Sequence, residues 1–309
     1  MKNPFKQAWG AFQYWRTFRK YPGVFALSDA CLQINRILVP GRLNDAHAAR
    51  ELDRYLQVFV NAEGEGVSRI HCSSIEIDFF WNAPVDNNMF FMVEQELNAK
   101  NPHCYTTDPI KLDQTGCIID VGACEGLFAF RMTKQHPNAI IHCFEPFGEM
   151  ADLIRKGSEF NRVKDQIKVH TIAVGASEGH VKFVASDSPD AGAVSPCSES
   201  DQDALKATTL DHFAAKNGLE LTCHDLIKID AEGADLDVLK GSEKIIRRYR
   251  PQIAVTTYHK DEHPEEIYTW LNDLDLGYRF RLKGFSFWTE KPRPVLLQAS
   301  TLDRAQVNI

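Results

Sequence analysis

The stretch CIIDVGACEGLFAF, residues 117–130, joins an apolar run that ends in an acid to a turn with two glycines and a second apolar run. A short apolar run, a glycine-containing turn and a helical pattern in this order are typical of a strand that leads into a helix. Glycine lets the backbone turn tightly and approach a ligand closely, because it has no Cβ. The stretch therefore predicts a strand–turn–helix unit, with Gly122 and Gly126 in a turn that is either purely structural or the floor of a ligand site.

Short apolar runs alternate with helical patterns from this stretch to about residue 260. We expect strands at CIIDV, AIIHCFE, IKVHTIAV, LIKID and QIAVTTYH, and helices at LFAFRMTKQH, GEMADLIRKGSEF and ADLDVLKGSEKIIRRY. Such alternation is typical of a parallel sheet with helices on both faces. The tail, LGYRFRLKGFSFWTEKPRPVLLQAS, has two extended runs with no helix between them, which predicts an antiparallel strand pair that closes the sheet.

The residues before this pattern form a mixed extension. We expect residues 1–85 to be an N-terminal helical and extended segment, with a helix at 43–60, and residues 86–309 to be the main domain. Residues 1–28 contain five basic residues, no acid and many aromatic residues. Aromatic stripes are more often core, so the preferred interpretation is a helix packed on the main domain or on a second subunit. The alternative is a helix on an anionic membrane surface.

Composition excludes several classes of protein. The 309 residues carry a net charge of −7, from 35 basic and 42 acidic residues, which disfavours nucleic acid as a partner. None of the eight cysteines forms a CxxC pair, so free thiols in a reducing compartment are expected. No apolar run approaches the roughly 20 residues that span a bilayer. The chain is therefore expected to be cytoplasmic.

Residues 185–204, rich in Ser, Asp and Pro, predict a loop of the kind that covers a site.

Ligands of open parallel sheets bind beyond the carboxyl ends of the strands, so each strand end can be searched for chemistry. The first strand ends in Asp120, and the GxxxG spacing that follows differs from the GxGxxG phosphate-binding turn. Asp120 would repel a pyrophosphate but could hold a cation, such as the sulfonium or ammonium group of S-adenosylmethionine. Glu145 ends the second strand, 23 residues after Gly122, and suits a ribose diol. Ala173 and Val174, at the third strand end, could flank an adenine.

The fourth strand end is the richest in charge. LIKIDAEGADLDVLKG, residues 226–241, carries Lys228, Asp230, Glu232 and Asp235. Burying several charges is costly unless they are paired or used, and their place at the ligand edge favours use. For Asp235, the dipole of the following helix is a sufficient explanation. His259 ends the fifth strand at the same edge and could serve as a general base.

Together, DVGACEG, FEP, TTLD (residues 208–211), KIDAEGADLDVLKG and RPQIAVTTYH resemble the FkbM family of S-adenosylmethionine-dependent methyltransferases, over about residues 117–260. The resemblance implies a class I methyltransferase (Rossmann-like) fold with a seven-stranded, mostly parallel sheet, and O-methylation of sugars or secondary metabolites. It implies that Asp120, Gly122, Ala123 and Gly126 line the methionine end of the cofactor and that Glu145 holds the ribose. Pro146, Ala173 and Asp230 are also expected to bind the cofactor, with Ala173 beside the adenine. Asp230 and Glu232 would lie near the transferred methyl group, with His259 alongside.

One residue departs from the family pattern. The family turn resembles DVGAN, and Cys124 stands here in place of the asparagine. Asparagine tolerates the left-handed conformation and makes local hydrogen bonds, whereas cysteine does neither well. The departure concerns a detail of the turn and not the identity of the cofactor.

The expected reaction is a direct displacement at the sulfonium methyl by a hydroxyl oxygen of a small-molecule or glycan acceptor. His259 is the first choice as base because its ordinary pKa lies near neutrality, with Asp230 or Glu232 as alternatives. The same acids could bind a divalent metal, but a reaction without metal is the preferred interpretation. The alternative functions are a dinucleotide-dependent oxidoreductase, which the missing third glycine disfavours, and a non-catalytic binding protein on the same fold.

Overall fold

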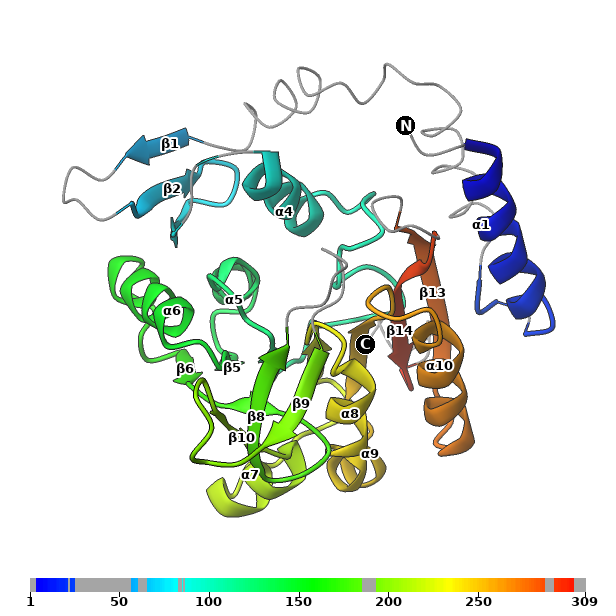
Figure 1. Ribbon diagram of the computed structural model, residues 1–309. Coiled ribbons are helices and arrows are strands. Elements are labelled where there is room, and N and C mark those ends of the chain that lie inside the picture. Colours follow the sequence, from blue (N-terminus) through cyan, green and yellow to red (C-terminus); the bar gives the residue numbers. More distant parts are fainter. Residues whose placement is uncertain are drawn as a thin grey trace.

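The computed structural model describes residues 4–21, 23–25, 57–60, 66–82, 85, 87–184, 193–286 and 292–302 (Figure 1). Seven strands form its central sheet, in the order β13-β14-β12-β11-β4-β5-β6. They are β4 (Cys117–Val121), β5 (Ile140–Phe144), β6 (Ile167–His170), β11 (Leu226–Ile229), β12 (Gln252–Thr256), β13 (Arg279–Phe285) and β14 (Pro294–Ser300). Neighbours from β12 to β6 are parallel, and β14 is antiparallel to both β12 and β13. The predicted class I methyltransferase fold, with its antiparallel C-terminal pair, is confirmed.

The strand order reverses at the centre of the sheet. The chain runs from β4 outward through β5 to β6, and then returns to place β11 on the other side of β4. The register sets Lys228 of β11 opposite Asp120 of β4. The turns that follow β4 and β11 therefore lie side by side, at the position where open parallel sheets bind their ligands.

Helices cover both faces of the sheet because its central strands are apolar on both sides. All five residues of β4 are buried: Ile119 and Val121 belong to one hydrophobic cluster, and Ile118 belongs to the other. The first cluster includes residues of α7 (Leu210–Asn217), α8 (Asp235–Lys240), α9 (Glu243–Tyr249) and α10 (His263–Asp273). The second includes residues of α4 (Asn87–Leu97), α5 (Leu127–Gln135) and α6 (Gly148–Phe160). This is the two-sided covering that the alternating pattern predicts.

A second sheet lies beside the first and departs from the predicted elements. The run IKVHTIAV does not form one strand, because β6 ends at His170 and Ala173–Val174 forms β7 of a four-stranded sheet. The other strands of that sheet are β8 (Gly179–Val184), β9 (Ala193–Cys197) and β10 (Leu205–Thr208), in the order β7-β10-β8-β9. Residues 193–197 of the predicted 185–204 loop are thus a strand, and residues 185–192 lie outside the described residues.

The run ADLDVLKGSEKIIRRY is two helices rather than one. Helix α8 ends at Lys240, and α9 begins at Glu243. Between them, a Cβ on Gly241 would come 2.0 Å from the carbonyl oxygen of Gly175, so the backbones of the two segments touch. The close approach requires glycine and separates the two helices.

The N-terminal extension contributes a helix and a small sheet. Antiparallel strands β1 (Gln57–Val60), β2 (Ser68–Cys72) and β3 (Ile77–Trp81) form a three-stranded sheet. The helix predicted at 43–60 is wrong for residues 57–60, which are β1, and its other residues lie outside the described part. Side chains of β2 and β3 join the same hydrophobic cluster as α5 and α6. The boundary between residues 85 and 86 stays a prediction.

Helix α1 (Pro4–Phe18) lies alongside α10 and β13 (Figure 1). Phe18 is 1% exposed and meets the Tyr268 ring of α10 edge-on at 5.6 Å between centroids. Phe25 forms an isolated bridge with Leu282 of β13. This inward face packs on the main domain, as the preferred interpretation of residues 1–28 expects. The outer face exposes Trp9 and Phe12.

Composition also led us to expect no membrane-spanning helix and free cysteine thiols. No helix within the described residues is both long and apolar enough to cross a membrane. The cysteines of the described part are free thiols: Cys72, Cys104, Cys117, Cys124, Cys143, Cys197 and Cys223. The cytoplasmic location stays a prediction.

Candidate functional site

A cavity of about 370 Å³ lies beyond the carboxyl ends of β4, β5 and β11. Predicted site residues on its wall are Gly122, Ala123, Glu145, Pro146, Ala173, Asp230 and Glu232. The strand-end search therefore brings seven predicted residues to one cavity. Asp120, Gly126 and His259 are not on the wall, and the roles predicted for all of these residues stay predictions.

The floor of the cavity depends on Gly122. Its φ is +74°, and a Cβ at this position would come 1.8 Å from the carbonyl oxygen of Asp230. The turn after β4 thus passes against the backbone of the turn after β11, which a side chain would prevent. Gly126, with φ +82°, is the N-cap residue of α5. One glycine allows the contact between the two turns, and the other starts the helix.

Two backbone amides hold the carboxylate of Glu145. Its Oε1 accepts a hydrogen bond from the Phe147 amide, and its Oε2 accepts one from the Cys124 amide, both at 3.0 Å. A carboxylate oxygen can accept more than one hydrogen bond, so Glu145 keeps acceptor capacity for a diol. The fixed orientation of this carboxylate on the cavity wall suits the predicted ribose contact.

Asp120 forms a buried ion pair with Lys228. The Lys228 Nζ lies 2.8 Å from Asp120 Oδ1 and donates to the carbonyl oxygen of Gly122 at 2.7 Å. Burial alone would lower the pKa of Lys228, but Asp120 and Asp230 outweigh it and raise that pKa above its ordinary value. The cation that Asp120 holds in the structure is this lysine of the neighbouring strand, and its predicted contact with the cofactor stays a prediction.

Hydrogen bonds from two distant segments position Asp230. The Tyr105 hydroxyl donates to Asp230 Oδ2 at 2.6 Å. The Thr256 hydroxyl lies 3.2 Å from Asp230 Oδ1 and 2.9 Å from Asp235 Oδ1. Tyr105 also lines the cavity and comes from the loop before β4. Asp230 is therefore fixed in place by a loop residue and by the end of β12.

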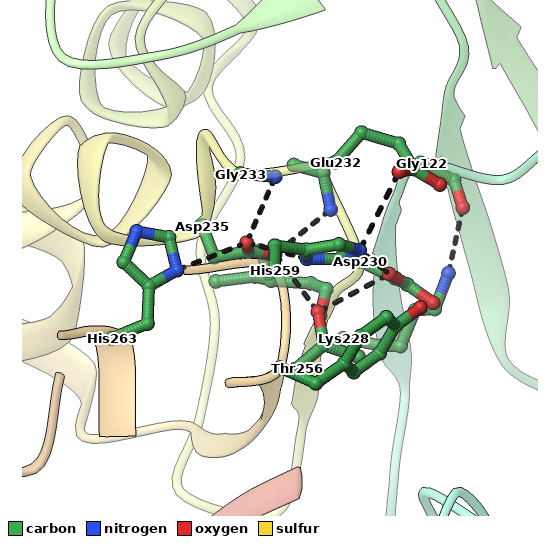
Figure 2. Close-up of polar contacts among 12 residues, drawn as sticks. Gly122, Lys228, Asp230, Glu232, Gly233, Asp235, Thr256, His259 and His263 are labelled. Carbon is green, nitrogen blue, oxygen red and sulfur yellow. Dashed lines mark hydrogen bonds and ion pairs between the residues drawn. The ribbon is translucent and has the colours of Figure 1, made fainter. Parts of the chain in front are cut away.

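Asp235 and His259 form a buried pair behind the cavity wall (Figure 2). His259 Nδ1 lies 2.9 Å from Asp235 Oδ2, while its Nε2 lies 3.5 Å from both Asp230 Oδ1 and Glu232 Oε2. Burial alone would lower the pKa of His259, but the three carboxylates outweigh it and raise that pKa to about 9. An imidazole with this pKa is protonated at neutral pH, which disfavours His259 as a base, and its predicted role stays a prediction.

Asp235 does more than complement a helix dipole. It is 0% exposed, and it accepts hydrogen bonds from the amides of Ala231 at 2.9 Å and Gly233 at 3.2 Å. Its carboxylate thus shapes the turn after β11 and holds His259 at the same time. The signal available in the sequence was His259 itself, because a buried histidine at a neighbouring strand end needs a partner.

Sequence reasoning also missed three other residues on the cavity wall: Tyr105, Glu96 and Glu125. Glu125 is 2% exposed, and its Oε2 has no hydrogen-bond partner among the described residues. Burial raises the pKa of Glu96 to about 7, although Arg131 opposes the shift. Glu96 and Tyr105 come before the first recognised motif in the sequence, so no pattern pointed to them. Glu125 lies within the turn after β4, where an acid is an ordinary turn residue and gives no signal of a site.

The cavity is electrostatically suited to a cation. Among the described residues, its wall carries five acidic side chains, those of Glu96, Glu125, Glu145, Asp230 and Glu232, and one basic side chain, Lys228, which pairs with Asp120. A pyrophosphate would be repelled by this wall, because like charges at close range are unfavourable. A ligand with sulfonium and ammonium groups would be attracted.

Comparison with known proteins identifies the family. The model of the methyltransferase FkbM domain matches residues 120–280, a range that holds the turn after β4, Glu145, Asp230 and His259. The chain belongs to the FkbM methyltransferase family. The FkbM match begins after Glu96 and Tyr105, so these two cavity residues come from outside the matched region.

Individual relatives of this FkbM methyltransferase are distant. It is 26% identical over 200 residues to methyltransferase sdnD of Sordaria araneosa, covering 55% of this chain and 76% of the relative. A structure of methyltransferase FkbM from Methylobacillus flagellatus KT is 17% identical, with a TM-score of 0.44, and the match covers 60% of this chain and 43% of that chain. The chain therefore spans less than half of that protein's length. The S-adenosylhomocysteine-bound methyltransferase PaMTH1 of Podospora anserina is 13% identical, with a TM-score of 0.34, covering 61% of this chain and 72% of that one.

Proposed function

We propose that this methyltransferase uses S-adenosylmethionine to methylate a hydroxyl oxygen of a sugar, glycan or secondary metabolite. The observation that carries the proposal is the acidic cavity, where Glu145 stands on the β5 side and Asp230 and Glu232 stand on the β11 side. The β5 side of the cavity suits the ribose of the cofactor, and the β11 side suits the reactive sulfonium of the same molecule. Family membership supports methyl transfer over the dinucleotide-dependent alternative.

Different residues of the cavity would bind the cofactor and align the acceptor. When bound, S-adenosylmethionine supplies a methyl group on a positively charged sulfur that leaves as a neutral thioether. Gly122 lets the backbone approach the ligand, and Glu145 binds the ribose hydroxyls. The wall then mainly has to align the acceptor oxygen with the methyl carbon, since a correct approach geometry removes much of the barrier.

We assign proton acceptance to Glu232. Neighbouring side chains already hold Asp230: the Tyr105 hydroxyl donates to its Oδ2 at 2.6 Å, and the Thr256 hydroxyl lies 3.2 Å from its Oδ1. Glu232 lines the cavity with a side chain that is 59% exposed, and its described polar contact is through Oε2 alone. Its Oε1 is then available to take the proton that the acceptor hydroxyl loses as the new C–O bond forms. His259, behind the wall, holds Glu232 and Asp230 in place.

The cofactor can be tested before the acceptor is known. A ligand that binds only the folded state stabilises it by about 2.7 kcal/mol at 100 times its Kd. The melting temperature of the protein should therefore rise when S-adenosylmethionine or S-adenosylhomocysteine is added. Glu145→Gln should weaken S-adenosylhomocysteine binding about 10- to 100-fold in calorimetry, because a charge-assisted hydrogen bond is lost. Glu149→Gln, an exposed acid nearby on α6, is the matched control and should bind normally. Stabilisation by NAD but not by S-adenosylmethionine would overturn the assignment.

Methyl transfer is then measured with radiolabelled S-adenosylmethionine and a panel of sugars, glycans and secondary metabolites. We expect transfer to a hydroxyl-bearing acceptor, and Glu232→Gln should lower kcat about 10²- to 10⁴-fold, as expected when a general base is lost. Tight S-adenosylhomocysteine binding without transfer to any member of the panel would favour a non-catalytic binding protein.

A further inference from the structure

Glu125 lies in the turn after β4 and has a carboxylate that is buried but only partly bonded. It is 2% exposed and stands on the cavity wall, and its Oε2 has no hydrogen-bond partner among the described residues. Burial raises the pKa of Glu125, although the Cys124 thiol and the amide of Glu125 itself oppose the shift. A buried acceptor without a donor is costly, so its place beside a cavity requires an explanation.

The other acids of the cavity wall differ from Glu125, because a group of the chain already holds each of them. The pairs are Glu96 with Arg131, Glu145 with the amides of Phe147 and Cys124, Asp230 with Tyr105 and Thr256, and Glu232 with His259. Within the described part of the chain, Glu125 takes part in no ion pair. Of these wall acids, Glu125 therefore has the most capacity for a cation that comes from a ligand.

Asp120, the acid that the sequence places at the methionine end of the cofactor, is already paired with a cation. Its Oδ1 lies 2.8 Å from Lys228 Nζ, and its side chain is 0% exposed. The same Nζ donates to the carbonyl oxygen of Gly122 at 2.7 Å. An incoming ammonium group would have to displace Lys228 from a carboxylate that has no exposed surface. An acid on the wall itself is a better partner for that group.

Cys124 connects Glu125 to the residue proposed to bind the ribose. The Cys124 thiol contacts the Glu125 carboxylate, and its amide donates to Glu145 Oε2 at 3.0 Å. Burial, and in addition the charge of Glu125, raise the pKa of Glu145, so the two carboxylates are near each other on the wall. In S-adenosylmethionine the ribose and the amino acid are joined through one carbon and the sulfur. A cofactor with its ribose on Glu145 can therefore bring its amino acid to the same part of the cavity.

We propose that Glu125 binds the ammonium group of S-adenosylmethionine through its unbonded carboxylate oxygen. The inference rests on the proposed function, because it requires this cofactor in the cavity. An ammonium N–H supplies the donor that Glu125 Oε2 lacks, and a hydrogen bond between two charged groups is stronger than one between neutral groups. The positive charge also compensates the burial of the carboxylate.

The experiment is isothermal titration calorimetry of the full-length chain with two ligands. S-Adenosylhomocysteine carries the ammonium group, whereas 5′-methylthioadenosine keeps the adenine and ribose but lacks the amino acid. Glu125→Gln keeps the size of the side chain and removes its charge. It should weaken S-adenosylhomocysteine binding about 10- to 100-fold, as loss of a charged hydrogen bond does, and 5′-methylthioadenosine binding less than about 2-fold. Binding of the second ligand also shows that the variant is folded.

Glu145→Gln is the matched control, because it removes the same charge from the same wall at the proposed ribose contact. Both ligands contain the ribose, so this variant should weaken both by a similar factor. The original chain provides a further test that needs no substitution. The 5′-S-(3-aminopropyl) analogue of thioadenosine, which keeps only the ammonium group, should bind more tightly than the 5′-S-(3-carboxypropyl) analogue, which keeps only the carboxylate.

The possible outcomes separate this contact from the identity of the cofactor. Equal weakening of both ligands by Glu125→Gln, or weakening of neither, would refute the ammonium contact and leave the proposed cofactor in place. Tighter binding of the carboxypropyl analogue by the original chain would refute the contact as well. If the original chain binds none of these ligands, the proposed function fails, and the role of Glu125 fails with it.

Discussion

Gly122 is the residue on which the contact between the two central turns depends. Gly122→Ala places a Cβ 1.8 Å from the carbonyl oxygen of Asp230, in a backbone conformation with φ +74°. The left-handed strain alone costs on the order of 1–3 kcal/mol, and the turn after β11 must also move. We expect a loss of at least about 3 kcal/mol in the free energy of unfolding, measured by urea denaturation, and loss of S-adenosylhomocysteine binding.

Gly148→Ala provides the comparison for that substitution. Gly148 begins α6, and a Cβ there meets no heavy atom within 4 Å. Alanine restricts the unfolded chain and favours a helix, so a gain of about 0.5–1 kcal/mol is expected. Similar losses in both variants would show that the contact between the turns is not the reason for Gly122.

Cys124 adopts the left-handed conformation, with φ +51°, in the turn where the family pattern has asparagine. Its amide donates to Glu145, and its thiol contacts Glu125 on the same cavity wall. Cys124→Asn should keep this amide in place at lower conformational cost, because asparagine tolerates that region better. Calorimetry should show equal or tighter S-adenosylhomocysteine binding, and Cys124→Ala separates loss of the thiol from this gain. A large loss of affinity in both variants would show that the thiol itself matters.

These residues show what strand ends in a sequence can and cannot reveal. Parallel strands end at one edge, so Gly122, Glu145 and Asp230 could be placed near each other before the structure was known. The side chains that complete the site could not be placed, because their partners lie far away in the chain. Tyr105 and Asp230 are 125 residues apart, and no local pattern links them.

Strands β5 and β6 carry a pair of stacked histidines that should make stability depend on pH. His142 Nδ1 lies 3.0 Å from His170 Nε2, and the two rings are 7° from parallel. Burial lowers the pKa of both, that of His170 to about 4, with His142 adding to the effect. A histidine with a depressed folded-state pKa contributes stability that is complete above its unfolded pKa of about 6.5 and is lost as pH falls toward 4.

His170→Phe should remove part of this dependence. A phenyl ring at this position can keep the contacts with Phe144 and Phe213, which already meet the imidazole. The fall in melting temperature from pH 7.5 to pH 5 should be smaller in the variant than in the original chain. Equal falls in the two proteins would mean that other groups cause the acid sensitivity.

Elements with a long, regular pattern were predictable, and short ones were not. Strands β4 and β11 and helices α5 and α6 match their predicted runs, because buried central strands and amphipathic helices have strong signals. Strand β7 has two residues, too few for any periodicity, and it exists because β10 pairs with it. The break between α8 and α9 depends on the approach of Gly175 to Gly241, a contact between segments distant in the chain.

The arrangement of the whole sheet came from the family resemblance and not from periodicity. Hydrophobic patterns identify buried strands but do not give their order, since any order of apolar strands buries similar surface. The structure adds that the N-terminal extension belongs to the same body: Ile70 and Ile77 share a hydrophobic cluster with Ile118 of β4. Its role could not be predicted because no motif covers it.

Helix α1 has one face packed on the main domain and one face exposed, and the two should behave differently on substitution. Phe18→Ala empties a site that is 1% exposed against α10, which should cost about 3–5 kcal/mol of unfolding free energy. Trp9→Ala changes a side chain that is 60% exposed and should stay within about 0.5 kcal/mol of the original chain.

The exposed face is also where the predicted membrane or dimer contact of residues 1–28 would form. Trp9 and Phe12 lie on it, and the segment has five basic residues and no acid. If anionic lipid is the partner, the chain should sediment with phosphatidylserine vesicles and not with neutral ones, and Trp9→Ala should weaken that binding several-fold. If a second copy is the partner, Trp9→Ala should instead lower the dimer fraction in sedimentation equilibrium without lipid. A monomer that ignores both vesicles would show that this face serves neither purpose, and that α1 acts only through its packing on α10.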